Sequence, residues 1–378
     1  MDTGPTDPTD LALVLSGGGA RAAYQAGVVC AIAERAPELS VPILTGVFAG
    51  AINTISLAAH PGSFGESAKA LRDEWSRLTI DHVYRVQVQG VWRPALRWLG
   101  RRLLRREHAT VVRGLFDMSP LCKFLSAQRD LANIEAKIGR GDVRAVALSA
   151  TCYGSGETIT FVQGIDDLVM WERSQRKSVR QPLSWDHVLA SSAIPLVFPA
   201  VQLGKAHYGD GSVRQAAPLA PAIHLGARRI LAIGMRPVWG RRRFQRNAGE
   251  YPSAAQIIGT LFHAIFLDAL DADAERLERV NRTLEGLPAG SLPDGLRPID
   301  LLVLRPSQDL GAMARPHWNR LPPVMRSLVR SIGGQREGSA DFLSYLLFDP
   351  AYTTPLMELG YDDTMANWET IERFLAGG

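Results

Sequence analysis

The chain has 378 residues, of which 46% are hydrophobic and 21% charged, so it is long and apolar enough to bury a full core. This composition excludes a disordered or fibrous protein. Its 42 Lys and Arg residues against 38 Asp and Glu residues leave a net charge of only +4, which does not indicate nucleic-acid binding.

Alternating apolar runs and helical patterns predict an α/β fold. The first 10 residues are polar and contain two prolines, so we expect a frayed tail without the apolar run of a signal peptide. The continuously apolar run 11–15 predicts a strand that is buried on both faces of a parallel sheet. Glycines end it, a helix is predicted over 22–34, and a second strand over 41–44 leads into a helix that starts near Gly50.

The rest of the chain continues this pattern. The three-to-four spacing of apolar residues over 257–266 predicts an amphipathic helix, and we expect its charged continuation, 271–282, to leave the core. From residue 316 onward the pattern is helical. Further buried strands are predicted over 143–150, 229–234 and 299–304, and a hairpin or edge strands over 151–171.

Cysteine and histidine usage predicts neither a disulfide framework nor a metal site. The three cysteines, Cys30, Cys122 and Cys152, are too far apart to form a C-x-x-C pair, and none of the eight histidines pairs with another at metal-ligand spacing. So few cysteines fit a reducing compartment. We expect a cytoplasmic protein. No stretch reaches 18 apolar residues, which excludes a spanning helix and leaves a peripheral contact at the inner membrane surface open.

A glycine-rich turn, Gly17-Gly18-Gly19-Ala20-Arg21, lies between the first strand and the first helix. Consecutive N–H groups at a helix N-terminus suit a phosphate or a developing oxyanion. The turn also fits the G-x-G-x-x-A fingerprint of dinucleotide-binding proteins, but the acidic residue that should close the next strand is replaced by Thr45-Gly46. A glycine turn required only for packing is the remaining interpretation.

The second informative segment, Gly46-Val47-Phe48-Ala49-Gly50, follows a strand and opens a helix. A nucleophile elbow, G-x-S-x-G, has this frame, and its middle residue sits on a strained strand-to-helix turn. Here the middle residue is Phe48. The frame is present and the nucleophile is missing.

The third segment places Asp210 between Gly209 and Gly211, where its carboxylate could be presented at a sheet edge. An Asp-Gly pair is also a common turn, so on its own it is more often structural. His207 precedes Asp210 by three residues and is interpreted as a strand or turn residue without a catalytic duty.

Together these three segments resemble the patatin-like phospholipase family, in particular its bacterial members. The family combines a glycine-rich oxyanion loop, a Ser on G-x-S-x-G and an Asp in an Asp-Gly motif, which form a Ser–Asp dyad without His. Residues 190–195 and 198–199 also resemble the family's segment upstream of its Asp. The matching residues are Gly17, Gly18, Gly19 and Arg21 for the loop, Gly46 and Gly50 for the elbow, and Asp210 for the base.

The resemblance implies a three-layer α/β fold, with a largely parallel central sheet, helices on both faces and C-terminal helices. It implies a catalytic core over 11–221, with 222–378 adding the remaining strands and a helical extension packed on the core. The implied activity is hydrolysis of carboxylic esters in lipids, without a metal or a cofactor. The residue at position 48 would attack, Asp210 would take its proton, and the loop amides of residues 17–21 would stabilise the oxyanion.

Phe48 departs from this pattern, because a phenyl ring has neither a lone pair to attack an ester nor a proton for Asp210 to remove. Three hypotheses follow. The chain is an altered hydrolase with Phe in place of the nucleophile, or a non-catalytic lipid-binding or regulatory relative whose Phe48 fills an acyl pocket. The third is a displaced nucleophile at Ser16, Thr45 or Ser191, which we disfavour because none of them lies on the elbow. A dinucleotide-binding enzyme is disfavoured, because the elbow frame and the Asp-Gly motif would then occur by coincidence.

Arg21 and a basic segment complete the candidate residues. Arg21 is expected to orient the glycine loop, the alternative being a salt bridge at a helix start. The segment 92–113 carries seven Arg against one Glu, interleaved with Trp and Leu, as in a basic amphipathic helix that lies on an anionic membrane; an ordinary helix with a solvated basic face is the alternative. No feature defines an oligomeric state. The candidate membrane contacts are Trp92, Arg97, Trp98, Arg101, Arg102 and Arg105.

Overall fold

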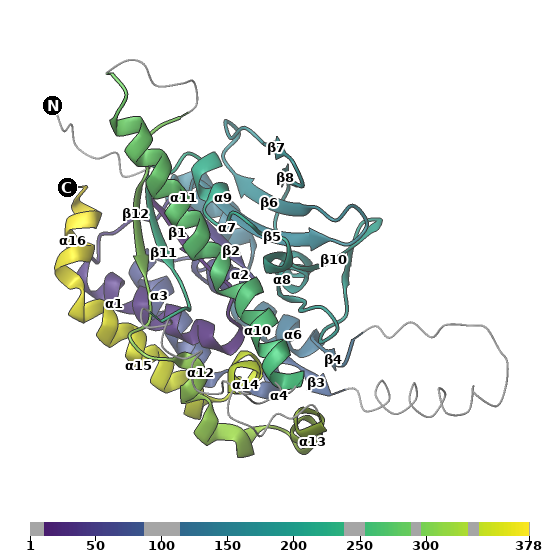
Figure 1. Cartoon of the computed structure of the whole chain (residues 1–378). Helices are drawn as coiled ribbons and strands as arrows, with labels where there is room; N and C mark the ends of the chain where they lie inside the picture. The colour runs from purple at the N-terminus through teal and green to yellow at the C-terminus, as the bar shows by residue number, and fades with distance from the viewer. Residues whose placement is uncertain (1–10, 87–113, 238–253, 289–295, 332–339, 378) are drawn as a thin grey trace.

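The structure is a computed structural model of the chain, shown in Figure 1. The predicted tail over 1–10 and the basic segment 92–113 fall outside the residues that it describes. The described residues are 11–86, 114–237, 254–288, 296–331 and 340–377.

A mixed sheet forms the centre of the described part of the chain (Figure 1). Its ten strands are β1 (Leu11–Leu15), β2 (Ile43–Val47), β5 (Ala145–Cys152), β6 (Thr158–Gly164), β7 (Glu172–Arg173), β8 (Arg176–Arg180), β9 (Val201–Leu203), β10 (Ala206–Asp210), β11 (Arg229–Ile233) and β12 (Asp300–Leu304). The order is β12-β11-β1-β2-β5-β6-β8-β7, and β10 pairs with β5 and β9. The five strands from β12 to β5 are parallel, whereas β6 and β10 run antiparallel to β5.

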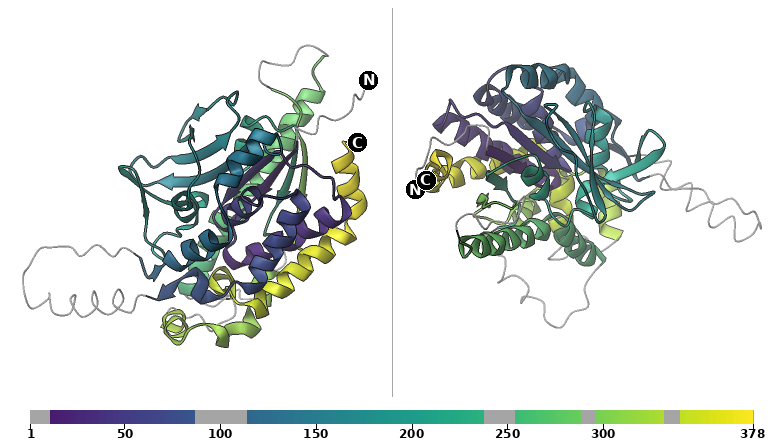
Figure 2. Two further views of the ribbon diagram at one scale, coloured as in Figure 1. Left: turned by 180° about the vertical axis from the view of Figure 1, so that it is seen from behind. Right: turned by 90° about the horizontal axis from the view of Figure 1, so that it is seen from above.

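Helices cover the sheet. They are α1 (Ala23–Arg35), α2 (Ala49–Ala58), α3 (Phe64–Arg77), α4 (Ile80–Val83), α6 (Ser119–Gln128), α7 (Ala132–Arg140), α8 (Trp185–Ser192), α9 (Ala220–His224), α10 (Ala254–Phe266), α11 (Asp268–Glu285), α12 (Leu310–Met313), α13 (Pro323–Ser331), α14 (Ala340–Leu346), α15 (Pro350–Ala366) and α16 (Trp368–Ala376), with 3-10 turns η2 (Gly19–Ala22), η3 (Gly211–Val213) and η5 (Arg315–Arg320). In Figure 1 α11 crosses in front of the sheet, and in the rear view of Figure 2 the N-terminal helices lie in front of it. None of the helices in the described ranges is long and apolar enough to span a bilayer.

Strand β1 shows why the sequence forms a doubly covered sheet. Leu11, Leu13 and Leu15 pack in the core between the sheet and the helices α1, α2 and α15, whereas Ala12 and Val14 pack in a second core under α9 and α11. Successive side chains of a strand point to opposite faces. A strand without polar residues therefore has both faces buried, as the continuous apolar run predicts.

The predicted strands over 11–15, 143–150, 229–234 and 299–304 are confirmed to within a few residues, but the second strand is shifted. The sequence predicts 41–44, and β2 spans Ile43–Val47. Pro42 has no N–H to donate to a ladder. The strand instead continues through Thr45 and Gly46, because β1 and β5 pair with it on both sides.

The expectation that 271–282 leaves the core is wrong. These residues belong to α11, whose Leu270, Leu277 and Leu284 are buried, two of them in the second core. Their seven-residue spacing gives a narrow apolar stripe on an otherwise charged helix. Asp273 is buried as well, and its carboxylate accepts a hydrogen bond from the Leu219 N–H at 2.9 Å.

Candidate active site

Phe48 occupies the tight turn between β2 and α2. Its backbone has φ 55° and ψ −124°, a conformation that non-glycine residues rarely adopt and that costs about 1–3 kcal/mol. Glycines flank it because β1, β2 and α2 approach closely here. A Cβ on Gly50 would overlap the carbonyl oxygen of Leu15, and one on Gly46 would overlap the Thr54 hydroxyl. The turn therefore has the strained backbone and the small neighbours that a nucleophile elbow requires.

The glycine loop lies directly beside this turn. A Cβ on Gly17 would come within 3.2 Å of the Phe48 Cβ and 2.8 Å of the Ser212 hydroxyl. Gly18 faces Met235 instead, and Gly19, with φ 58°, lies against the backbone of Tyr345 in α14. Ala20 and Arg21 follow in η2 and are buried. Of the three glycines, Gly17 is thus the one that faces position 48.

Arg21 ties the glycine loop to the C-terminal part of the chain. Its Nε donates to the Ser344 hydroxyl at 2.7 Å, and its Nη2 forms a 3.1 Å ion pair with Asp341. The guanidinium also lies 4.4 Å from the ring centroid of Tyr345. Arg21 therefore makes the salt bridge that the sequence analysis left as an alternative, and this salt bridge fixes α14 against the loop.

Asp210 ends β10 and caps the short turn η3. Its Oδ1 accepts a hydrogen bond from the Ser212 N–H at 2.8 Å, whereas its Oδ2 has no partner among the described residues. The side chain is fully buried. Burial raises the pKa of the carboxyl to about 8, although the Ser212 N–H lowers it. The Ser212 hydroxyl is also buried and, like Oδ2, has no hydrogen-bond partner among the described residues. Asp210 is thus a buried acid with one oxygen left free.

The fold brings these three segments to one place. Position 48 and Ser212 both contact Gly17, and Ser212 is bound to the Asp210 carboxylate. Gly211 packs so tightly on β5 and β2 that a Cβ there would overlap the Ser149 carbonyl oxygen and approach Val47 within 2.7 Å. Loop, elbow and Asp210 are therefore neighbours although up to about 190 residues separate them in sequence.

Aromatic side chains cover Phe48. Its ring stacks on that of Phe266 from α10, with centroids 5.0 Å apart, and Phe266 in turn contacts Phe262 and Tyr345. Phe48 also lines an apolar cavity of about 10 Å³, which has room for one water molecule at most. It is lined by Phe48, Ala49, Ile52, Val83, Met118, Leu121, Ser192, Ile194, Phe198, Tyr345 and Phe348.

The structure gives the three candidate displaced nucleophiles other surroundings or other partners than a nucleophile would need. Ser16 donates to the Ile233 carbonyl at 2.8 Å, and Ser191 donates to the Ser149 carbonyl at 2.7 Å. The Thr45 hydroxyl is buried without a partner among the described residues, but Thr45 shares its strand face with Ile43, which packs in the second core. Phe48 packs in the first core, on the opposite face.

Two parts of the site are not predicted from the sequence. Ser212 holds the Asp210 carboxylate, and the helices α10 and α14 cover position 48. The Asp-Gly-Ser sequence indicates the contact of Ser212 with Asp210, because a residue two positions after an Asp commonly donates its N–H to that side chain. The cover depends on the contact of Phe266 with Phe48, more than 200 positions away, and on the contact of Tyr345 with Phe266. No local pattern indicates these contacts.

Within the described ranges no group of three or more His, Cys, Asp or Glu side chains is arranged to hold a metal ion. The candidate membrane contacts Trp92, Arg97, Trp98, Arg101, Arg102 and Arg105 lie outside the described residues.

The chain belongs to the patatin-like phospholipase family, since the model of this family matches residues 13–223. The match includes the glycine loop, the elbow frame and Asp210. No curated protein matches the chain.

Two solved structures are also similar to this chain, at low sequence identity. Human GIVD cytosolic phospholipase A2, in complex with methyl γ-linolenyl fluorophosphonate, shares 13% identity over 99% of this chain, with a TM-score of 0.44. VipD from Legionella pneumophila shares 13% identity over 93% of this chain and 67% of its own, with a TM-score of 0.34. The chain spans 60% of the length of the human structure.

Proposed function

We propose that this chain has the scaffold of a lipid acyl hydrolase and that Phe48 makes it inactive. The observation that carries the proposal is the free Oδ2 of Asp210, a buried carboxylate oxygen without a partner among the described residues. Buried polar atoms without partners are rare and need an explanation. A hydroxyl on residue 48 would supply the missing donor, and the family to which the chain belongs has a serine there.

The chemistry follows from this arrangement once a serine occupies position 48. Its Oγ attacks the ester carbonyl carbon while the hydroxyl proton passes to Asp210 Oδ2. The negative charge that develops on the carbonyl oxygen is stabilised by backbone N–H groups of the glycine loop. The ester C–O bond then breaks, and the proton on Asp210 goes to the leaving alkoxide. Water repeats the two steps and releases the fatty acid.

A fluorophosphonate reagent tests this assignment, because it forms a covalent bond only with an activated hydroxyl. We expect the Phe48→Ser form to be labelled at residue 48 and the unaltered chain to remain unlabelled. Phe48→Ala is the matched control, since it removes the ring without adding a hydroxyl. Labelling of the unaltered chain, or of Ser16 or Ser191, would mean that position 48 is not the nucleophile position.

The alternative function is lipid binding without catalysis, and the apolar lining around Phe48 favours an acyl chain as the bound group. In the described conformation, however, the Phe48 ring and the small cavity leave no room for such a chain. Binding of a fatty acid to the unaltered chain by calorimetry would support this alternative. Binding to Phe48→Ala alone would show that the ring fills the acyl position.

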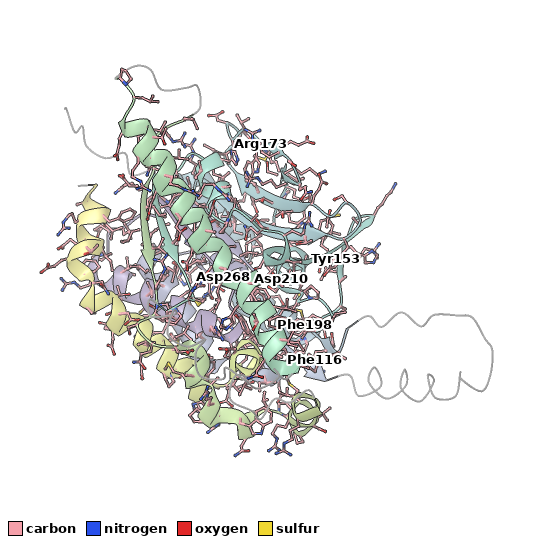
Figure 3. The ribbon with its side chains drawn as sticks, in the orientation of Figure 1. Phe116, Tyr153, Arg173, Phe198, Asp210 and Asp268 are labelled. Atoms are coloured by element: carbon pink, nitrogen blue, oxygen red, sulfur yellow. The ribbon has the colours of Figure 1, made fainter. Side chains whose placement is uncertain are left out.

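We further propose a peripheral contact between the basic segment 92–113 and an anionic membrane. The described residues on either side of it form a two-stranded ribbon, β3 (Arg85–Val86) and β4 (Phe116–Asp117). The Phe116 N–H donates to the Val197 carbonyl at 3.0 Å, and the Phe116 ring lies beside Phe198 of the cavity lining (Figure 3). The neighbouring Leu196 is 86% exposed. The described residue Phe116, which follows this part of the chain, therefore lies next to the candidate acyl site.

Vesicle binding distinguishes this contact from a solvated basic face. We expect binding to vesicles of phosphatidylcholine and phosphatidylglycerol at low salt, with loss of binding in high salt. Replacing Arg101, Arg102 and Arg105 by Gln should weaken it by at least about 10-fold, at about 1 kcal/mol for each charge. The control is the same replacement of Arg241, Arg242 and Arg243. Equal loss in both triple variants would show nonspecific attraction instead.

A further inference from the structure

The C-terminal end of α8 contacts both position 48 and Asp210. The Ser191 hydroxyl accepts a hydrogen bond from the Phe48 N–H at 3.1 Å, and the Ser192 hydroxyl donates to the Phe48 carbonyl at 2.9 Å. The next residue, Ala193, accepts a hydrogen bond from the Asp210 N–H at 2.9 Å. Three consecutive residues thus bind the backbone of the two positions that would form the dyad.

The same segment is anchored to the sheet. Ser191 uses its own proton to donate to the Ser149 carbonyl in β5 at 2.7 Å. This carbonyl lies against Gly211, the residue after Asp210. Both Ser191 and Ser192 are fully buried. Each hydroxyl therefore has defined partners and no solvent to exchange them with.

These bonds are not the ones that a serine in a helix usually forms. A helical Ser hydroxyl commonly bonds to the carbonyl three or four residues earlier in the same helix. Ser67 in α3 does so, donating to the Phe64 carbonyl at 2.7 Å. Ser191 and Ser192 instead bond to the turn at Phe48. Ser191 provides an acceptor for the N–H of this strained residue, and Ser192 provides a second donor to its carbonyl, which also accepts a hydrogen bond from the Ala51 N–H at 3.0 Å. Strained backbone persists only where its surroundings hold it in place.

We propose that Ser191 and Ser192 are positioning residues that hold the turn at position 48 in its strained conformation and, through Ala193, at a fixed distance from Asp210. Their hydroxyls act on the backbone and touch no reacting atom. The effect of this role on catalytic rate rests on the proposed function. Its effect on the backbone of position 48 does not.

The structural consequence is measured in the unaltered chain by residue-resolved hydrogen exchange. We expect Ser191→Ala to speed exchange of the Phe48 N–H by at least about 10-fold, because this variant removes its acceptor. The matched control Ser67→Ala removes an equally buried hydroxyl whose hydrogen bond stays within α3, and it should leave exchange at Phe48 unchanged. Unchanged exchange at Phe48 in a folded Ser191→Ala chain would overturn the proposal.

The kinetic consequence is measured in the Phe48→Ser background. We expect Ser191→Ala and Ser192→Ala each to lower kcat by about 10- to 100-fold with little change in KM, since displaced reacting groups slow the chemical step. If the two serines contribute only to stability, their Ala variants should have a lower melting temperature but the same kcat as Ser67→Ala. That result would refute a positioning role. If Ser191→Ala does not fold, Ser192→Ala decides the question, because it acts on the other polar group of residue 48.

The two measurements separate this inference from the proposed function. If the Phe48→Ser form hydrolyses nothing, the hydrolase proposal fails and the exchange measurement still decides whether Ser191 holds the turn.

Discussion

The Phe48→Ser form is expected to hydrolyse a short chromogenic ester and phospholipid vesicles at least about 10³-fold faster than the unaltered chain. Loss of the nucleophile from a serine hydrolase costs about 10⁶-fold in kcat, so restoring it in an intact site recovers a large part of that factor. The proposed site keeps its other parts: Oδ2 of Asp210 has no partner among the described residues, and Gly17 contacts position 48. Loss of the Phe48 ring also opens space beneath Phe266.

Two variants control this experiment. Phe48→Ala opens the same space without a nucleophile and should remain inactive. The Phe48→Ser form with Asp210→Asn keeps the hydroxyl and loses the base, so we expect its rate to fall by at least about 10²-fold. Activity in the unaltered chain would refute the assignment of position 48. Inactivity of the Phe48→Ser form would leave lipid binding as the better-supported function.

The pH dependence of the Phe48→Ser form gives a further check on Asp210. The base must be ionised to accept a proton, so the rate should rise with pH through the pKa of this carboxyl. Burial holds that pKa at about 8 in the unaltered chain. A donated hydrogen bond from the new hydroxyl stabilises the carboxylate and lowers the pKa. We therefore expect the midpoint of the rise to lie below 8.

Much of the fold could be predicted because the composition of its central strands indicates that both of their faces are buried. A run such as Leu11–Leu15 has no polar face, and only a strand covered on both sides can bury it. The helix α11 could not be predicted in the same way. Its buried leucines are seven residues apart among charged residues, so average polarity hides the apolar stripe.

The site shows the same division between local and long-range signals. The glycines at 46 and 50 could be assigned to close packing because a strand-to-helix turn needs small residues, and their contacts with Thr54 and Leu15 agree. The roles of Ser191 and Ser192 could not be assigned. Their partner Phe48 lies more than 140 residues away, and a Ser-Ser pair at a helix end has no local pattern that indicates such a contact.

Replacing Asp210 by Asn in the unaltered chain is expected to stabilise it at alkaline pH and to have little effect at acid pH. The folded chain raises the pKa of this carboxyl from 3.8 to about 8. Between these values the unfolded chain has released the proton and the folded chain retains it. The free energy of unfolding therefore falls as pH rises from about 4 to about 8, and the loss is complete above that range.

Asn has no proton to lose in this range, and its side-chain oxygen can still accept the hydrogen bond from the Ser212 N–H. We expect the melting temperature of Asp210→Asn to exceed that of the unaltered chain by at least about 4 °C at pH 9, and the difference to shrink to about 1 °C or less at pH 4. Asp362→Asn, an exposed position on α15, is the control and should show no such trend. A difference for Asp210→Asn that is constant across pH would mean that the fold stabilises the Asp210 carboxylate as well as water does. The free Oδ2 would then have a partner, and the central argument for a missing hydroxyl at position 48 would fail.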